Sequence, residues 1–269
     1  MHPEAVCKGV RSRMARTIAV LLAVLGAVCL VGSLPRVAQD NGYHLFADTR
    51  SLLGMNNWSN VLSNAGFCAA GVVGLLRTRQ LRRSTAVFIW RCFFTAIVCV
   101  GLGSGYYHWQ PSNNTLLWDR LPMTLGFASL VAGLAGERFG DQTGRRLFGP
   151  LAAAGASSVL YWWLSEQAGA GDLRPYILVQ YLPMILVPLI ILLFPQGTRF
   201  DRPYWVLLLW YVVAKGFEWQ DAGVFALTGG FLGGHALKHL AAAAGLLMFK
   251  PGALQAAARV VSQGAKEID

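Results

Sequence analysis

The sequence predicts an all-α integral membrane protein, with a seven-transmembrane-helix core and one extra N-terminal helix, eight helices in all. The first observation is composition: of 269 residues, 55% are hydrophobic and only 13% are charged, and the mean hydropathy is +0.45. The second is that the apolar residues fall in blocks of about twenty, each long enough to cross a hydrocarbon core of about 30 Å. The third is the distribution of positive charge.

The net charge of +10 does not point to nucleic acid, because 16 of the 23 Lys and Arg lie in short loops or tails. If eight helices alternate across a bilayer, all 16 fall on one side, and the opposite loops hold only Arg36, Arg50 and Arg174. Positive residues collect on the cytoplasmic side of membrane proteins. We therefore expect a multi-pass protein with both termini in the cytoplasm.

The first apolar block, residues 17–34, follows a basic segment that contains Lys8, Arg11 and Arg16. It is longer than the apolar region of a usual signal peptide, so we expect a retained helix, and a cleaved signal remains the alternative. A polar loop over 36–57 follows. Residues 1–56 thus form an N-terminal region, residues 57–250 the seven-helix core, and residues 251–269 a cytoplasmic tail.

The seven core helices follow from the remaining apolar blocks. Only WQPSNN separates the second core helix from the third, so these two must form a tight hairpin. Pro183 and Pro188 lie inside another block and are expected to kink its helix. The predicted helices cover 58–76, 85–108, 115–136, 147–165, 175–195, a segment from 203 onward, and 231–249.

Two histidines in the segment FLGGHALKHL, His235 and His239, indicate a metal site. Residues four apart lie on the same face of a helix, and ionisable side chains in an apolar run are costly and usually functional. In the predicted topology a third histidine, His108, lies at the same non-cytoplasmic end of the bundle. Zinc is the natural metal for three neutral imidazoles, with a fourth position open to water.

Two further residues fit chemistry at such a site. Asp119, at the start of the following helix, can take and return a proton. Ser104 lies one turn before His108 and can stabilise developing negative charge on a carbonyl oxygen. Each has a structural alternative: Asp119 can pair with Arg120, and Ser104 can serve only close packing.

The polar residues in KGFEWQD leave two interpretations open. Glu218 and Asp221 can accept hydrogen bonds from the histidines and so orient them. They can equally pair with Lys215 and Lys238. We expect a structural or supporting role for both acids.

Four short motifs, in order along residues 57–249, resemble those of the alkaline ceramidases: NVLSN over 60–64, Ser104-x-x-x-His108, LLWDRLPM with Asp119, and GHALKH over 234–239. The resemblance implies a zinc-dependent amidase that cleaves a ceramide-like lipid to a sphingoid base and a fatty acid. It implies zinc bound by the three histidines, with Asp119 and Ser104 assisting. Eukaryotic members carry an acidic calcium site before the first core helix. Here Asn57 replaces a glutamate and only Asp40 and Asp48 are near, so calcium is not expected.

Other functions remain in competition. The wider superfamily contains the adiponectin and progestin receptors, so a non-enzymatic zinc-containing receptor or lipid-binding protein is the main alternative. Bis-histidine haem binding is disfavoured, because histidines four apart on one helix cannot easily occupy opposite axial positions. A rhomboid-like serine protease is disfavoured because Leu102 stands where that family's GxSG motif begins. The sequence indicates no obligatory protein partner.

Overall fold

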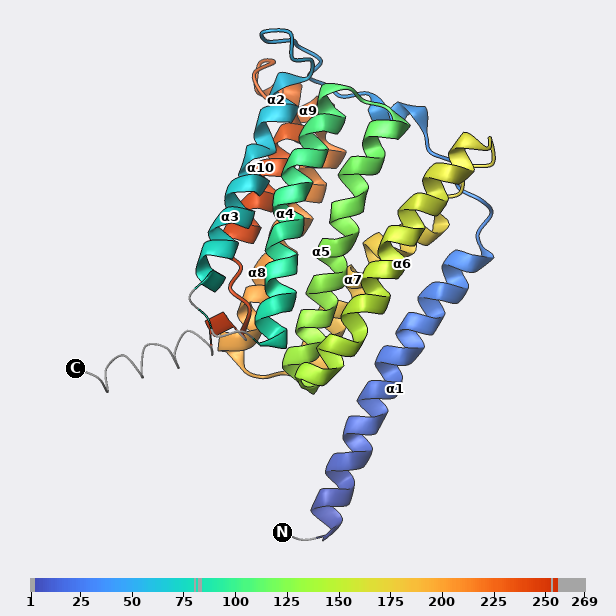
Figure 1. Cartoon of the computed structure of the whole chain (residues 1–269), viewed down its shortest axis with the longest axis vertical. Helices are drawn as coiled ribbons and strands as arrows, with labels where there is room; N and C mark the ends of the chain where they lie inside the picture. The colour runs from blue at the N-terminus through green and yellow to red at the C-terminus, as the bar shows by residue number, and fades with distance from the viewer. Residues whose placement is uncertain (1–2, 80, 82–83, 253, 256–269) are drawn as a thin grey trace, which may run out of the picture.

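A computed structural model describes residues 3–79, 81, 84–252 and 254–255, and within these ranges the protein is all-α (Figure 1). The expected fold class is confirmed to that extent. The elements are α1 (Pro3–Ser33), the short 3₁₀ helix η1 (Asn41–His44), α2 (Trp58–Ser63), α3 (Ala65–Arg79), α4 (Thr85–Trp109), α5 (Asn113–Phe139), α6 (Asp141–Gln167), α7 (Arg174–Leu193), α8 (Thr198–Trp219), α9 (Asp221–Leu227) and α10 (Gly234–Met248).

Five segments of the described chain are long and apolar enough to cross a membrane. These are Arg11–Ser33, Trp58–Arg79, Thr85–Trp109, Asp141–Gln167 and Arg174–Leu193. Helices α5, α8 and α10 do not belong to this set, and α10 has only 15 residues, a length of about 22 Å. The eight-helix count therefore stays a prediction.

Several helix boundaries differ from the sequence expectation. Helix α1 begins at Pro3, well before residue 17, and α6 begins at Asp141 rather than 147. In both, the helix includes polar turns ahead of the apolar span that the sequence pattern marks.

Two blocks that were expected as single helices are divided. The block over 58–76 divides into α2 and α3 at Asn64, and the block from 203 onward divides at Gln220 into α8 and α9.

The helices from α3 to α6 lie side by side in chain order, and α8 and α10 pack behind them (Figure 1). Helix α10 contacts both α3 and α8, which closes the bundle. Helix α1 lies outside it and packs against α7. Both ends of α7 are bonded to the α1 segment: Arg16, in the middle of α1, donates to the carbonyl of Leu193, and Arg174 donates to the carbonyl of Leu34, just after α1.

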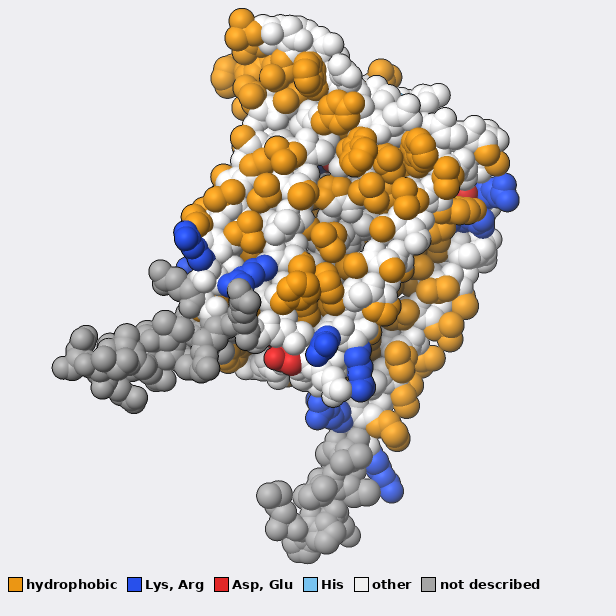
Figure 2. Space-filling model, viewed as in Figure 1, with side chains coloured by type: hydrophobic (Ala, Val, Ile, Leu, Met, Phe, Trp, Pro, Cys, Tyr) orange, Lys and Arg blue, Asp and Glu red, His pale blue; other side chains and the backbone are white. Residues whose placement is uncertain are grey.

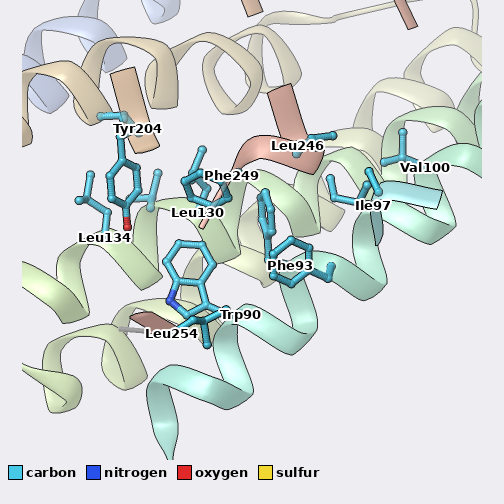
Figure 3. Packing of buried hydrophobic residues seen from close by; sticks show 14 of the residues in the cluster. Trp90, Phe93, Ile97, Val100, Leu130, Leu134, Tyr204, Leu246, Phe249 and Leu254 are labelled. Atoms are coloured by element: carbon cyan, nitrogen blue, oxygen red, sulfur yellow. The ribbon is translucent and has the colours of Figure 1, made fainter. Parts of the chain in front are cut away.

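A group of aromatic rings lies within the larger hydrophobic core (Figure 3). The ring of Phe249, just after α10, contacts Trp90 and Phe93 of α4 and Tyr204 of α8 edge to face. Such pairs contribute about 0.5–1.5 kcal/mol beyond their buried area. This cluster joins the last helix to the middle of the bundle.

Hydrophobic side chains also cover much of the outer surface, and in the view shown Lys and Arg gather mainly near the end where α1 begins (Figure 2). Large apolar residues such as Leu76, Leu164 and Leu209 are more than half exposed. Contiguous exposed apolar surface marks a membrane or protein contact. The surface is consistent with the apolar spans described above.

Two glycines allow the close helix contacts that position the functional residues. A Cβ on Gly103 of α4 would lie 2.0 Å from the backbone oxygen of Trp118 in α5. A Cβ on Gly234, the first residue of α10, would lie 2.2 Å from the backbone oxygen of Phe217 in α8. Only glycine fits either position, because real Cβ atoms do not approach backbone so closely.

The α4–α5 hairpin is as tight as the sequence suggested. Only three residues separate Trp109 from Asn113. Ser112 caps α5: its hydroxyl accepts from the backbone N–H of Thr115, and the Thr115 hydroxyl accepts from the backbone N–H of Ser112. This capping box satisfies two N–H groups that a helix start leaves free, and it starts α5 directly beside the end of α4.

Candidate metal centre

Three histidines from two helices meet inside the bundle. His108 lies in the last turn of α4, and His235 and His239 occupy the first two turns of α10. One ring nitrogen from each lies within 4.8 Å of the other two, and the ring centroids are 4.7–5.0 Å apart. All three are buried. Within the described ranges this is the one cluster of three or more His, Cys, Asp or Glu arranged to hold a metal ion.

The hydrogen bonds of the rings suit metal binding. The Ser63 hydroxyl donates to the carbonyl of Asn60 and lies 2.8 Å from Nδ1 of His239. It therefore accepts the Nδ1 proton, which leaves Nε2 of His239 with a free lone pair. Nδ1 of His108 and Nε2 of His235 are buried without a hydrogen-bond partner. Such orphaned buried acceptors are rare, and a shared cation would satisfy them.

Neighbouring residues fix the backbone and rings of these histidines. The side chain of Asn57 donates to the carbonyl of His108 at 2.8 Å. The Phe46 ring lies edgewise on both His108 and His235, with centroids 4.7 Å apart in each case. Sequence reasoning did not find Phe46, because its role depends on how the loop before α2 folds back over the helix ends.

Asp221 holds that loop and the start of α10 together. One carboxylate oxygen accepts from the backbone N–H of His235 at 2.8 Å, and the other accepts from the backbone N–H of Ala47 at 2.9 Å. It thus supports the site through the backbone of a histidine. The hydrogen bonds of Asp221 are therefore to the backbone, rather than to a histidine ring or to Lys215 and Lys238, the partners that the sequence suggested.

Glu218 instead pairs with both nearby lysines, Lys215 and Lys238. One oxygen accepts from Lys238 Nζ at 2.7 Å, and the second accepts from Lys215 Nζ. All three side chains line the same cavity as the histidines. The network lies between α8 and α10.

Asp119 and Ser104 lie next to the histidines. Ser104 is one turn before His108 on α4 and is hydrogen-bonded to the Asp119 carboxyl. Both residues are buried and both line the cavity. Arg120 points elsewhere: it donates to Gln39 at 2.7 Å, and its guanidinium lies 4.2 Å from the centroid of the Trp162 ring.

The cavity has a volume of about 210 Å³ and a mostly apolar lining. From the histidines it follows α4 along Val100, Ile97 and Phe93, which lie three or four residues apart. Val187 of α7 and Leu207 of α8 lie on other walls. From His108 to Phe93 the helix covers 15 residues, or about 22 Å. The polar groups are therefore placed at one end of a long hydrophobic space.

The two acids near the first core helix, Asp40 and Asp48, do not belong to the histidine cluster. Burial alone would raise the pKa of the Asp48 carboxyl, but hydrogen bonds from Arg50 and Ser59 outweigh burial and lower that pKa. Arg50 contacts both oxygens of Asp48 at 2.8 Å, and Ser59 donates to one of them at 2.5 Å. Asp40 accepts from the backbone N–H of Gly42 at the start of η1. The positive charge that pairs with the Asp48 carboxylate is thus the guanidinium of Arg50.

No protein-family model matches the chain, and no curated protein sequence matches it.

Proposed function

We propose that this chain is a zinc-dependent integral-membrane amidase, which hydrolyses the amide bond of a ceramide-like lipid to a sphingoid base and a free fatty acid. One observation carries the proposal: three buried histidines, two of them with an unpartnered buried ring nitrogen, lie at the polar end of a long apolar cavity that also contains Asp119 and Ser104. The four short motifs that resemble the alkaline ceramidases supply the substrate class.

His108, His235 and His239 would hold the zinc ion. When bound, zinc supplies a Lewis acid that polarises water or a carbonyl oxygen and makes water acidic enough to react at neutral pH. Three neutral imidazoles with a fourth position left open are the ligand set of a catalytic rather than a structural zinc site. Ser63 keeps the proton of His239 on Nδ1, away from the metal side.

Asp119 carries the proton in the proposed reaction. Its carboxylate takes a proton from the attacking water as the water oxygen bonds to the carbonyl carbon. When the carbon–nitrogen bond breaks, the leaving amine needs a proton, and Asp119 returns it. Ser104 can rotate its hydroxyl from Asp119 toward the carbonyl oxygen, where it donates to the developing negative charge.

The rest of the bundle supports a lipid substrate. An apolar space of this length accepts a hydrocarbon chain, while the reacting group stays beside the histidines. We propose seven core helices over residues 57–250 with α1 as the eighth. Both termini then lie in the cytoplasm, and the site lies near the non-cytoplasmic face.

Metal analysis combined with a hydrolysis assay tests this proposal. The purified protein should contain one zinc per chain and release fatty acid from a labelled ceramide. Asp119→Asn should retain zinc and lose activity by about two to four orders of magnitude, as expected for a lost proton-transfer group. Asp141→Asn provides a matched control, since Asp141 lies in the first turn of α6 and is absent from the cavity lining.

Two results would contradict the proposal in different ways. A protein without stoichiometric zinc would exclude the metal centre. A protein with zinc but no turnover, in which Asp119→Asn still binds lipid, would favour the non-enzymatic receptor or lipid-binding alternative.

A further inference from the structure

The network of Lys215, Glu218 and Lys238 is the largest group of charges in the cavity that the proposed reaction does not use. Lys215 and Glu218 are one turn apart on α8, and Lys238 lies on α10 between His235 and His239. Glu218 accepts from both lysines. Surface charge clusters are usually solvated, but this one lines a cavity with mostly apolar walls.

The two lysines of the network keep hydrogen-bond donors to spare. Two ammonium groups share the Glu218 carboxylate, and both oxygens of that carboxylate are occupied. Each ammonium has three protons to donate, and each lysine makes one hydrogen bond within this network. The lysine side chains are partly exposed, 38% for Lys215 and 19% for Lys238, so their remaining N–H groups can reach an anionic ligand in the cavity.

A third donor lies beside the lysines. The Tyr211 hydroxyl is buried without a hydrogen-bond partner, and Tyr211 lines the cavity one turn before Lys215 on α8. Buried polar atoms without partners are rare in folded proteins. Together the ammonium and hydroxyl groups present several donors, and only the hydroxyl can also accept, so they suit an acceptor-rich group.

Lys238 also places this charge close to the reacting groups. Lys238 directly precedes His239 on α10, and it lines the same cavity as Asp119 and the three histidines. An anion bound at Lys238 would therefore lie next to the proposed site of amide cleavage.

We propose that Lys238 and Lys215, assisted by Tyr211, bind an anionic group of an acyl lipid, a carboxylate or phosphate, beside the histidine centre. This inference deepens the proposed function, on which it rests for the acyl lipid. The anionic group can come from two sources: an acidic headgroup on the amide substrate, or the carboxylate of the released fatty acid. In both cases charge-assisted hydrogen bonds from the lysines provide the affinity.

Binding of two matched probes tests the proposal without turnover. Palmitic acid and palmityl alcohol share one alkyl chain and differ in charge at a pH of about 9, where the carboxylic acid is ionised. Each is titrated into the full-length protein in neutral detergent against a labelled fatty acid. We expect the acid to bind about tenfold more tightly or better, as a charged hydrogen-bonded pair provides. Equal affinity for acid and alcohol would overturn the proposal.

Four variants assign the preference to the network. Lys238→Met should bring the two affinities to within about twofold, and Lys238→Arg should retain most of the difference. Lys215→Met is the second test should the first variant fail to fold. Glu218→Gln should increase the preference for the acid, because it removes the competing negative charge. A structural role for Glu218 would not produce that increase.

Lys250→Met is the matched control, since Lys250 follows α10 and is absent from the cavity lining. It should keep the wild-type preference. If Lys238→Met and Lys215→Met keep that preference as well, the carboxylate binds elsewhere, for instance to the metal, and the proposal fails.

Hydrolysis assays then distinguish the two sources of the anion. A higher kcat/KM for an N-acyl amino acid or a phosphorylated ceramide than for neutral ceramide, lost in Lys238→Met, identifies the headgroup. Equal kcat/KM with strong inhibition by palmitate identifies the product. If no amide is hydrolysed but palmitate still binds more tightly than its alcohol, the amidase proposal fails and the anion site stands.

Discussion

The hydroxyl of Ser63, at the end of α2, lies 2.8 Å from Nδ1 of His239, in the second turn of α10. The two residues are 176 positions apart in sequence. Because Ser63 donates to the carbonyl of Asn60, it can only accept from the imidazole. The bond fixes both the ring orientation and the nitrogen that remains free for a metal.

Removal of this hydroxyl should weaken zinc binding. We expect Ser63→Ala to reduce zinc affinity by roughly 10–100-fold, the usual effect of losing a hydrogen bond to a metal ligand, while Ser63→Thr retains most of it. Competition with a calibrated chelator measures the affinity. Ser129→Ala is a control, since that buried hydroxyl bonds only within α5. Unchanged affinity in Ser63→Ala would show that the bond does not orient a ligand.

Substitution of a histidine inside the cluster should change the metal content of the protein, and substitution of a histidine outside it should not. His235→Ala should abolish stoichiometric zinc, because two imidazoles leave the ion with too few protein ligands. His44→Ala should retain zinc, since His44 bonds to the Tyr107 hydroxyl and to Asn113 outside the cluster. Metal analysis of the purified variants measures both. Loss of zinc in His44→Ala, or its retention in His235→Ala, would contradict the assignment.

Close contact between α4 and α5 should make Gly103 intolerant of any side chain. A Cβ there meets the Trp118 carbonyl oxygen at 2.0 Å, so Gly103→Ala must separate the helices. We expect a loss of about 3 kcal/mol or more and reduced zinc and hydrolytic activity. Gly149→Ala, in α6 with no atom within 4 Å of the added Cβ, should be neutral or slightly stabilising. Thermal unfolding in detergent compares the two variants.

The stability of the fold should depend on pH through Asp172, which lies before α7. Hydrogen bonds from Arg174 lower the pKa of the Asp172 carboxyl from 3.8 to about 2. The ionised form therefore stabilises the fold at pH values above about 4, and this contribution is lost as pH falls toward 2. Asp172→Asn should cost on the order of 1–2 kcal/mol at neutral pH.

The difference in Tm between wild type and Asp172→Asn measures this contribution. It should stay constant between pH values of about 5 and 7, and it should shrink below a pH of about 4. A difference that grows on acidification would have the wrong sign for a carboxyl with a lowered pKa.

The sequence predicted the helices and the site residues for physical reasons that act locally. Apolar blocks indicate membrane-spanning helices because the thickness of the hydrocarbon core is fixed. The i, i+4 spacing of His235 and His239 places both residues on one face of a helix. The structure brings His108 to that face because α2 and α3 pack against both α4 and α10, which are non-local contacts. The role of Glu218 stayed open for the same reason, since lysines on two different helices compete for it.

Other parts of the site could not be derived from local patterns. Phe46 reaches two histidines from a loop without periodicity. Ser63 is one of several small polar residues near the start of the core, and nothing in the spacing separates it from Asn60 or Asn64. Ser63 contacts His239 because of how α2 packs against α10, which the sequence pattern does not show.

The attachment of α1 along α7 covers the outer face of one cavity wall. Hydrogen bonds of Arg16 and Arg174 fasten α1 to the two opposite ends of α7, and Tyr176, Gln180 and Met184 of α7 form one wall of the cavity. Under the proposed function, a lipid that enters from the surrounding bilayer would reach the cavity between other helices, and not across the face of α7 that α1 covers. The added helix would then act as a brace on that wall.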